Sequence, residues 1–148
     1  MAKSGRLRLA DVRAALRLVG ECRDLGYDPA LWLQHACEGA CGLFGARVVM
    51  GAEAHWPRPG GPNTPLQAAL VGMPPAVVRD FNRYVRTGGL ETDVVGARLK
   101  DLPGRHVIRR RRQLLSDRAW YGAPHYDVLY RPSGIDNGIA TRDRKSVV

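Results

Sequence analysis

Large aromatic side chains gather in one short segment near the C-terminal end of the sequence, which contains Trp120, Tyr121, Tyr126 and Tyr130. Such rings combine an apolar body with a polar edge, so they can line a small-molecule cavity. Aromatic residues on the expected helices upstream could contribute to the same cavity. The candidate ligand-binding residues are Trp32, Phe81, Trp120, Tyr121 and Tyr126, and packing in a core stays the alternative for each of them.

The second cluster that could do chemistry is a run of four arginines, which follows Arg105 and His106. Guanidinium groups bind phosphates through charge and paired hydrogen bonds. The chain also carries a formal net charge of +9. However, it shows no zinc-finger spacing, no RNP signature and no helix-turn-helix pattern. Binding of nucleic acid through Arg109, Arg110, Arg111 and Arg112 is therefore the alternative function, and a solvated edge that pairs with Asp101, Asp117 or a partner subunit is the structural interpretation.

Metal binding and catalysis have less support from the residues. Cys37 and Cys41 are four residues apart on an expected helix, but His35 points off their line, and a structural zinc ion needs four ligands. We expect buried apolar cysteines, no metal and no cofactor. The sequence also lacks the GxSxG, GxxxxGKS, HExxH and GxGxxG motifs. We therefore expect a protein that is not an enzyme.

Hydrophobic spacing predicts the elements of the first half of the chain. Leu9, Val12, Leu16 and Val19 form one side of an amphipathic helix that ends near Gly26. Asp28 and Pro29 predict the start of a second helix that ends at Gly45. Residues 46–54 and 66–73 are expected to form an antiparallel pair of strands, joined by the proline-rich loop of residues 56–65.

The second half alternates helices and strands. The patterns predict helices over 76–87 and 92–102, the second with Thr92 as its cap, and a short helix capped by Ser116 that carries Trp120. Residues 105–110 and 135–140 are expected to be strands. The fold class predicted from this order is α+β, with an antiparallel sheet flanked by helices, in one domain over residues 1–142.

Several motifs, taken in order, carry a family resemblance. The segments DPALWLQHACEGACGLFGARV, PPAVVRDFNRYV, DRAWY, RP and GIDNGI together resemble the N-terminal sensory region of bacterial helix-turn-helix transcriptional regulators of the LuxR type. The likeness covers most of Leu7 to Ala140 and implies a GAF- or PAS-like sensory domain that binds a small molecule. It also implies DNA binding through a C-terminal module that this chain lacks. The first helix is the expected surface for a homodimer.

The chain shows no features of secretion or of membrane insertion. Its three cysteines do not form a disulfide framework. The N-terminus lacks the apolar core and cleavage site of a signal peptide, and no apolar run is long enough to span a bilayer. We expect a cytoplasmic protein without membrane contact.

The last residues, Asp143 to Val148, match the translation of a common sequencing adaptor. We hypothesise that residues 143–148 are an assembly artefact and that the natural chain continues beyond Arg142. In that case the strand over 135–140 would lack its downstream partner and would leave an exposed sheet edge.

Overall fold

The computed structural model describes residues 7–55 and 64–143, which belong to two compact units, Met1–Met73 and Pro74–Val148. The single domain predicted from the sequence, over residues 1–142, spans parts of both units. The elements are those of a mixed α+β protein, as predicted. The antiparallel sheet is present as two separate two-stranded sheets, one in each unit.

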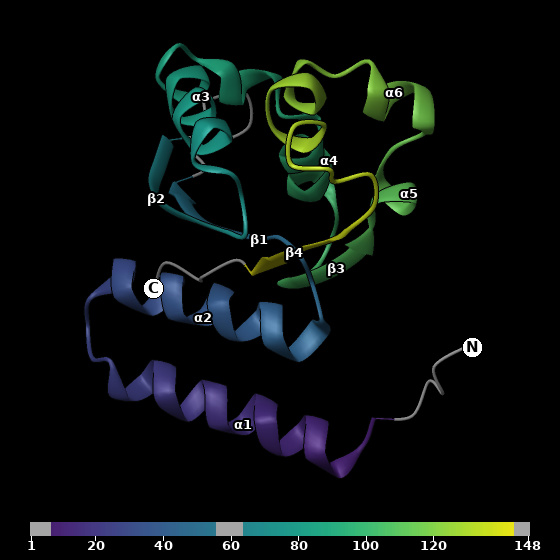
Figure 1. Cartoon of the computed structure of the whole chain (residues 1–148). Coiled ribbons are helices and arrows are strands. Elements are labelled where there is room, and N and C mark those ends of the chain that lie inside the picture. Colours follow the sequence, from purple (N-terminus) through teal and green to yellow (C-terminus); the bar gives the residue numbers. More distant parts are fainter. Residues whose placement is uncertain (1–6, 56–63, 144–148) are drawn as a thin grey trace. The chain divides into compact units, whose positions relative to one another are not determined.

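The first unit contains two long helices followed by a pair of strands (Figure 1): α1 Leu9–Asp24, α2 Pro29–Phe44, β1 Val49–His55 and β2 Thr64–Val71. β1 and β2 are antiparallel, with Val49 opposite Val71 and a register shift between Glu53 and Ala54. All four predicted elements are confirmed to within a few residues. Of the predicted loop, residues 56–63 lie outside the described residues, and Thr64 and Pro65 already belong to β2.

Local chemistry sets both ends of α2. The Asp28 side chain accepts hydrogen bonds from the backbone N–H groups of Ala30 (2.9 Å) and Leu31 (3.2 Å), which satisfies two free donors of the first turn. Gly45 ends the helix in the left-handed region, with φ of 59°. The aspartate–proline start and the glycine stop were therefore predicted correctly.

Glycines let α2 approach its neighbours closely on two sides. A Cβ atom added to Gly39 would lie 2.2 Å from a methyl group of Leu18 on α1. One added to Gly51 on β1 would lie 2.6 Å from the Cys37 sulfur. α2 accordingly contacts α1, β1 and β2. The buried side chains of this unit include Cys22, Cys37, Ala69 and Met73.

The predicted apolar side of α1 is not the side that packs against α2. Leu18 contacts α2 at Gly39, and Cys22, one turn later, is buried. The predicted stripe remains exposed: Leu9 64%, Val12 39%, Leu16 66% and Val19 66%. The pattern was recognised correctly as helical, but its period alone does not say which neighbour, if any, covers it.

The second unit has shorter elements: α3 Pro75–Arg86, η1 Gly89–Thr92, α4 Val94–Asp101, β3 His106–Arg110, α5 Arg111–Leu114, α6 Asp117–Tyr121, η2 Tyr126–Tyr130 and β4 Ile139–Asp143. The predicted α3, β3 and α6 are confirmed. Thr92 was wrong as the cap of α4, because it belongs to the 3₁₀ turn η1. Asp93 caps the helix instead, accepting a hydrogen bond from the Val95 N–H at 3.0 Å.

β3 and β4 form an antiparallel ribbon in which His106 lies opposite Asp143 and Arg110 lies opposite Ile139. The last strand therefore begins later than the predicted residue 135, and β3 is its partner. The core of this unit comprises Val77, Phe81, Leu99, Val107, Leu115, Trp120, Ala123, Leu129 and Tyr130.

Arg142 of β4 fixes the turn that follows α4. Its side chain is buried and donates hydrogen bonds to the carbonyl oxygens of Leu99 (2.7 Å), Lys100 (3.0 Å) and Leu102 (3.1 Å), and to that of Gly104. These carbonyls lie at or beyond the end of α4, where the helix offers them no N–H donors. One guanidinium group therefore ties β4 to the C-terminal end of α4.

Within residues 7–55 and 64–143, no helix is both long enough and apolar enough to cross a membrane.

Candidate functional site: an aromatic network in the second unit

Aromatic rings of the second unit contact one another from α3 to η2. Phe81 of α3 lies edge-on to His125, with ring centroids 5.8 Å apart. His125 in turn lies 6.0 Å from Tyr130 of η2. Tyr130 then packs against Trp120 of α6 at 4.3 Å. We call the set formed by these four rings with Tyr121 and Tyr126 the aromatic network.

The network ends in two tyrosines at right angles. Tyr126 lies 5.7 Å from Trp120, and Tyr121 lies 5.0 Å from Tyr126 with an interplanar angle of 89°. Edge-to-face pairs of this kind are favourable because the positive ring edge meets the negative ring face. α6 and η2 therefore present a corner whose two walls are phenol rings.

Burial divides the network into a core and an accessible end. Phe81, Trp120, His125 and Tyr130 are buried, Tyr126 is half-buried, and Tyr121 keeps 44% of its surface exposed. The Tyr121 hydroxyl donates a hydrogen bond of 2.7 Å to the exposed carboxylate of Asp136. This bond raises the pKa of Tyr121, because it stabilises the neutral phenol beside a carboxylate.

Arg111 supplies a buried positive charge next to the rings. Its guanidinium carbon lies 5.5 Å from the Trp120 ring centroid and 5.9 Å from that of Tyr121, within the range of cation–π attraction. Its Nη1 donates a hydrogen bond to Asp117 and lowers the pKa of that carboxyl. The backbone N–H of Arg111 also donates to the Gly138 carbonyl at 2.9 Å. Arg111 therefore links α5, α6 and the start of β4.

His125 is an aromatic member of the core of the second unit. It is 3% exposed, and its ring also lies 5.2 Å from Tyr84, edge-on. Burial lowers the pKa of His125 from its usual 6.5, while the Asp93 charge opposes this shift to a smaller extent. The ring is therefore neutral at pH 7.

Some buried polar atoms of the second unit have no hydrogen-bond partner among the described residues: Arg111 Nε, Trp120 Nε1, His125 Nδ1 and Ser133 Oγ. Three of them belong to the aromatic network or to the guanidinium packed on it. A buried donor without an acceptor costs free energy. The polar groups of the network are thus not fully satisfied by the residues that the structure describes.

The structure brings together most of the predicted ligand-binding residues. Trp120, Tyr121 and Tyr126 are in direct contact, and Phe81 joins them through His125 and Tyr130. Trp32, the remaining predicted residue, lies on α2 of the first unit. The sequence analysis missed Arg111 as a network residue because its run of arginines suggested an exposed patch.

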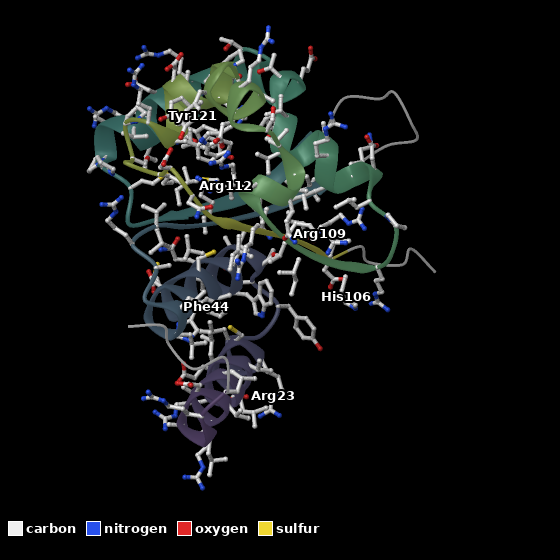
Figure 2. The ribbon with its side chains drawn as sticks, turned by 90° about the vertical axis from the view of Figure 1, so that its right-hand side faces the viewer. Arg23, Phe44, His106, Arg109, Arg112 and Tyr121 are labelled. Carbon is white, nitrogen blue, oxygen red and sulfur yellow. The ribbon has the colours of Figure 1, made fainter. Side chains whose placement is uncertain are left out.

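The four adjacent arginines do not form one exposed surface. Arg109 and Arg110 end β3, whereas Arg111 and Arg112 begin α5, and Figure 2 shows Arg109 and Arg112 at separate places. The Arg111 side chain is 4% exposed and pairs with Asp117, as the structural interpretation expected. Arg109 is half-buried and donates to the Ile108 carbonyl at 2.8 Å. The Arg111 side chain is therefore engaged within the second unit, whereas Arg110 and Arg112 are exposed.

The cysteine and histidine cluster of α2 is engaged differently. His35 Nε2 lies 2.9 Å from the carboxylate of Glu21 on α1, and Cys37 is buried against β1 at Gly51. Burial raises the pKa of the Cys37 thiol. Across the described parts of the chain, no three His, Cys, Asp or Glu side chains are placed to hold a metal ion.

Comparisons of the chain with known protein families, with curated proteins and with solved structures found no match.

Proposed function

We propose that the chain is the non-enzymatic sensory region of a LuxR-type transcriptional regulator and that its second unit binds a small planar molecule at the corner formed by Tyr121 and Tyr126. GAF- or PAS-like folding, a cytoplasmic location and DNA binding through a separate C-terminal module belong to this proposal. These expectations rest on the sequence motifs that resemble such regulators. One of these motifs, DRAWY, forms α6 and contributes two rings of the aromatic network.

The observation that carries the proposal is the combination of buried and accessible rings. Small-molecule sites consist mostly of apolar and aromatic surface with a few polar groups that fix orientation. The corner is formed by two phenol rings, with the Arg111 guanidinium 5.9 Å from the Tyr121 ring and the Trp120 ring 5.7 Å from that of Tyr126. A bound molecule that displaces Tyr121 from Asp136 would break the hydrogen bond that joins α6 to the 134–138 turn.

Three probes test this site: indole as a neutral ring, benzoate as an anionic ring and tetramethylammonium as a cation. We expect indole or benzoate to bind the purified chain in calorimetric titrations, at millimolar concentrations suited to fragments of this size. Tetramethylammonium should bind more weakly, because Arg111 already lies against the Trp120 and Tyr121 rings.

The control is a matched tyrosine. Tyr126→Ala should abolish binding of the probes, whereas Tyr27→Ala should leave it unchanged, since Tyr27 is fully exposed and lies in the first unit. Circular dichroism would establish that both variants are folded. Absence of binding by either ring probe, or equal binding by the two variants, would refute the proposed site.

Binding of nucleic acid through the arginine run is the alternative function. Its remaining support is the exposure of Arg110 and Arg112 and the net charge of +9. Replacement of both residues by alanine should then remove most of the affinity for a DNA duplex and reduce the salt dependence of binding, as measured by fluorescence anisotropy. If the wild-type chain shows no binding even at low salt, this alternative is wrong.

A further inference from the structure

The exposed stripe of α1, which we define as Leu9, Val12, Leu16 and Val19, consists of apolar side chains on one side of the helix. Its spacings of three, four and three residues are those of the seam positions of a two-helix coiled coil. At about 100° per residue, the stripe is centred roughly 120° around the helix from the side of Leu18 and Cys22, which faces α2. α1 therefore carries a second apolar face that its own unit does not cover.

The charges next to the stripe have one sign. Arg8 and Arg13 flank it on opposite sides, Arg17 lies further round, and none of the three pairs with a carboxylate among the described residues. The acids of α1 are engaged elsewhere. Asp11 accepts from the Arg8 backbone N–H at 3.1 Å, and Glu21 lies 2.9 Å from His35. Asp24 pairs with Arg23 at 3.1 Å.

This rim disfavours a second copy of α1 as the occupant. In a parallel pair, Arg8 of each helix would lie opposite Arg13 of the other, and Arg23 would meet its own copy in the seam. In an antiparallel pair with the stripes in register, Arg13 would face Arg13 of the other helix. Like charges at these positions select against a pairing. The dimer expected from the sequence would therefore carry unfavourable contacts in either orientation.

We propose that the stripe of α1 binds an amphipathic helix of a partner protein whose apolar seam is flanked by glutamate or aspartate. Leucine-rich seam positions would cover the stripe, and the flanking acids would pair with Arg8 and Arg13. The residue at position 20 fits this arrangement. Gly20 lies inside α1 beside the seam, and an added Cβ would meet nothing within 4 Å, so packing within the chain does not require a glycine there. The open space can receive a bulky partner side chain.

Two synthetic peptides of three heptads test the proposal on the full chain. Both have leucine at the seam positions; one has glutamate at every flanking position and the other has lysine. We expect the glutamate peptide to bind in fluorescence anisotropy titrations and the lysine peptide to bind at least about tenfold more weakly. Arg13→Glu should reverse part of this preference.

Matched variants distinguish binding of the peptide at the stripe from its attraction to the overall positive charge of the chain. Leu16→Glu should weaken binding of the glutamate peptide at least about tenfold, because the substitution places a negative charge in the seam. Ala10→Glu makes the same change in net charge at an exposed position off the stripe and should bind nearly as wild type does. Circular dichroism would verify that both variants remain helical.

Three results would overturn the proposal. Equal binding of the two peptides would mean unspecific apolar contact. Equal binding by Leu16→Glu and Ala10→Glu would place the peptide elsewhere. Dimerisation of the chain without peptide that Leu16→Glu abolishes, measured by analytical ultracentrifugation, would identify a second copy as the occupant.

Discussion

Two buried arginines of the second unit, Arg111 and Arg142, show that a charged side chain can hold a small unit together as well as contact solvent. Arg111 is paired with Asp117 and packs on two aromatic rings, while Arg142 donates to several backbone carbonyls. Both lie in stretches rich in exposed charge, so residue type gave no sign of their burial. Strand alternation predicts that Arg142 shares a face with Ala140, but only the packed structure shows which groups accept its hydrogen bonds.

Replacement of Arg142 by alanine should destabilise the second unit by about 2–4 kcal/mol, because it leaves several carbonyls without donors near the end of α4. Arg142→Lys should recover part of the loss, since an ammonium group cannot reach all of them. Urea denaturation followed by Trp120 fluorescence would measure the free energy of unfolding. Arg105→Ala, at an exposed position, is the control and should change it by less than about 0.5 kcal/mol. Similar values for Arg105→Ala and Arg142→Ala would contradict the role of Arg142.

The pKa of His125 makes stability depend on pH in a defined window. Because burial lowers the pKa in the folded state, the unfolded chain binds more protons below pH 6.5. The contribution of neutral His125 to the stability of the folded state is therefore present above pH 6.5 and is lost as the pH falls towards the pKa of His125 in the folded chain. We expect His125→Phe to flatten the decline in the urea midpoint between pH 6.5 and pH 5. A wild-type slope in His125→Phe would argue against this account.

At the scale of elements, the sequence predicted the helices and strands well where strong local signals exist. The Asp28–Pro29 start, the Gly45 stop and the Ser116 cap act within one helical turn, and each is present in the structure. The start of α4 was misplaced by two residues because Thr92 and Asp93 are both good caps. The choice between them depends on the preceding 3₁₀ turn, where Thr92 Oγ1 donates to the Gly89 carbonyl at 2.8 Å.

Tertiary contacts determine which side of an element is buried, and local sequence patterns do not predict this. The pattern of α1 showed which residues share a side, but small residues such as Gly39 determine which side approaches α2. The arginine run likewise crosses from β3 into α5, and this change of period buries one member and exposes the next. Neither outcome follows from residue type or spacing alone.

Two glycines of the first unit should respond oppositely to the same substitution. Gly72 has φ of 78°, and an added Cβ would lie 2.1 Å from the Arg47 carbonyl oxygen. Gly72→Ala should therefore lower the free energy of unfolding by at least about 2 kcal/mol, because both the positive φ angle and the lack of space exclude a side chain. Gly20→Ala should instead stabilise α1 by about 0.5–1 kcal/mol. Thermal and urea unfolding would compare them, and a loss of stability in Gly20→Ala would show that this position is constrained within the chain.

At the scale of the whole molecule, the chain is basic and contains two compact units. Composition indicated the charge, but the division at Met73 and Pro74 has no linker rich in glycine, serine or charge to mark it. The proposed functions also separate by unit. The ligand site belongs to the second unit, and the helix-binding stripe belongs to the first. A variant that removes one should leave the other intact, so the two proposals can fail independently.

The most direct test of the sensory proposal follows the Trp120 indole N–H, a buried donor in the aromatic network. In ¹⁵N-labelled protein its resonance would be assigned with Trp120→Phe and followed during titration with indole and with benzoate. We predict a saturable shift of this resonance that Tyr126→Ala eliminates and Tyr27→Ala preserves. A Trp120 resonance that stays unchanged throughout both titrations, or that shifts equally in Tyr126→Ala, would contradict a ligand site at the Tyr121–Tyr126 corner.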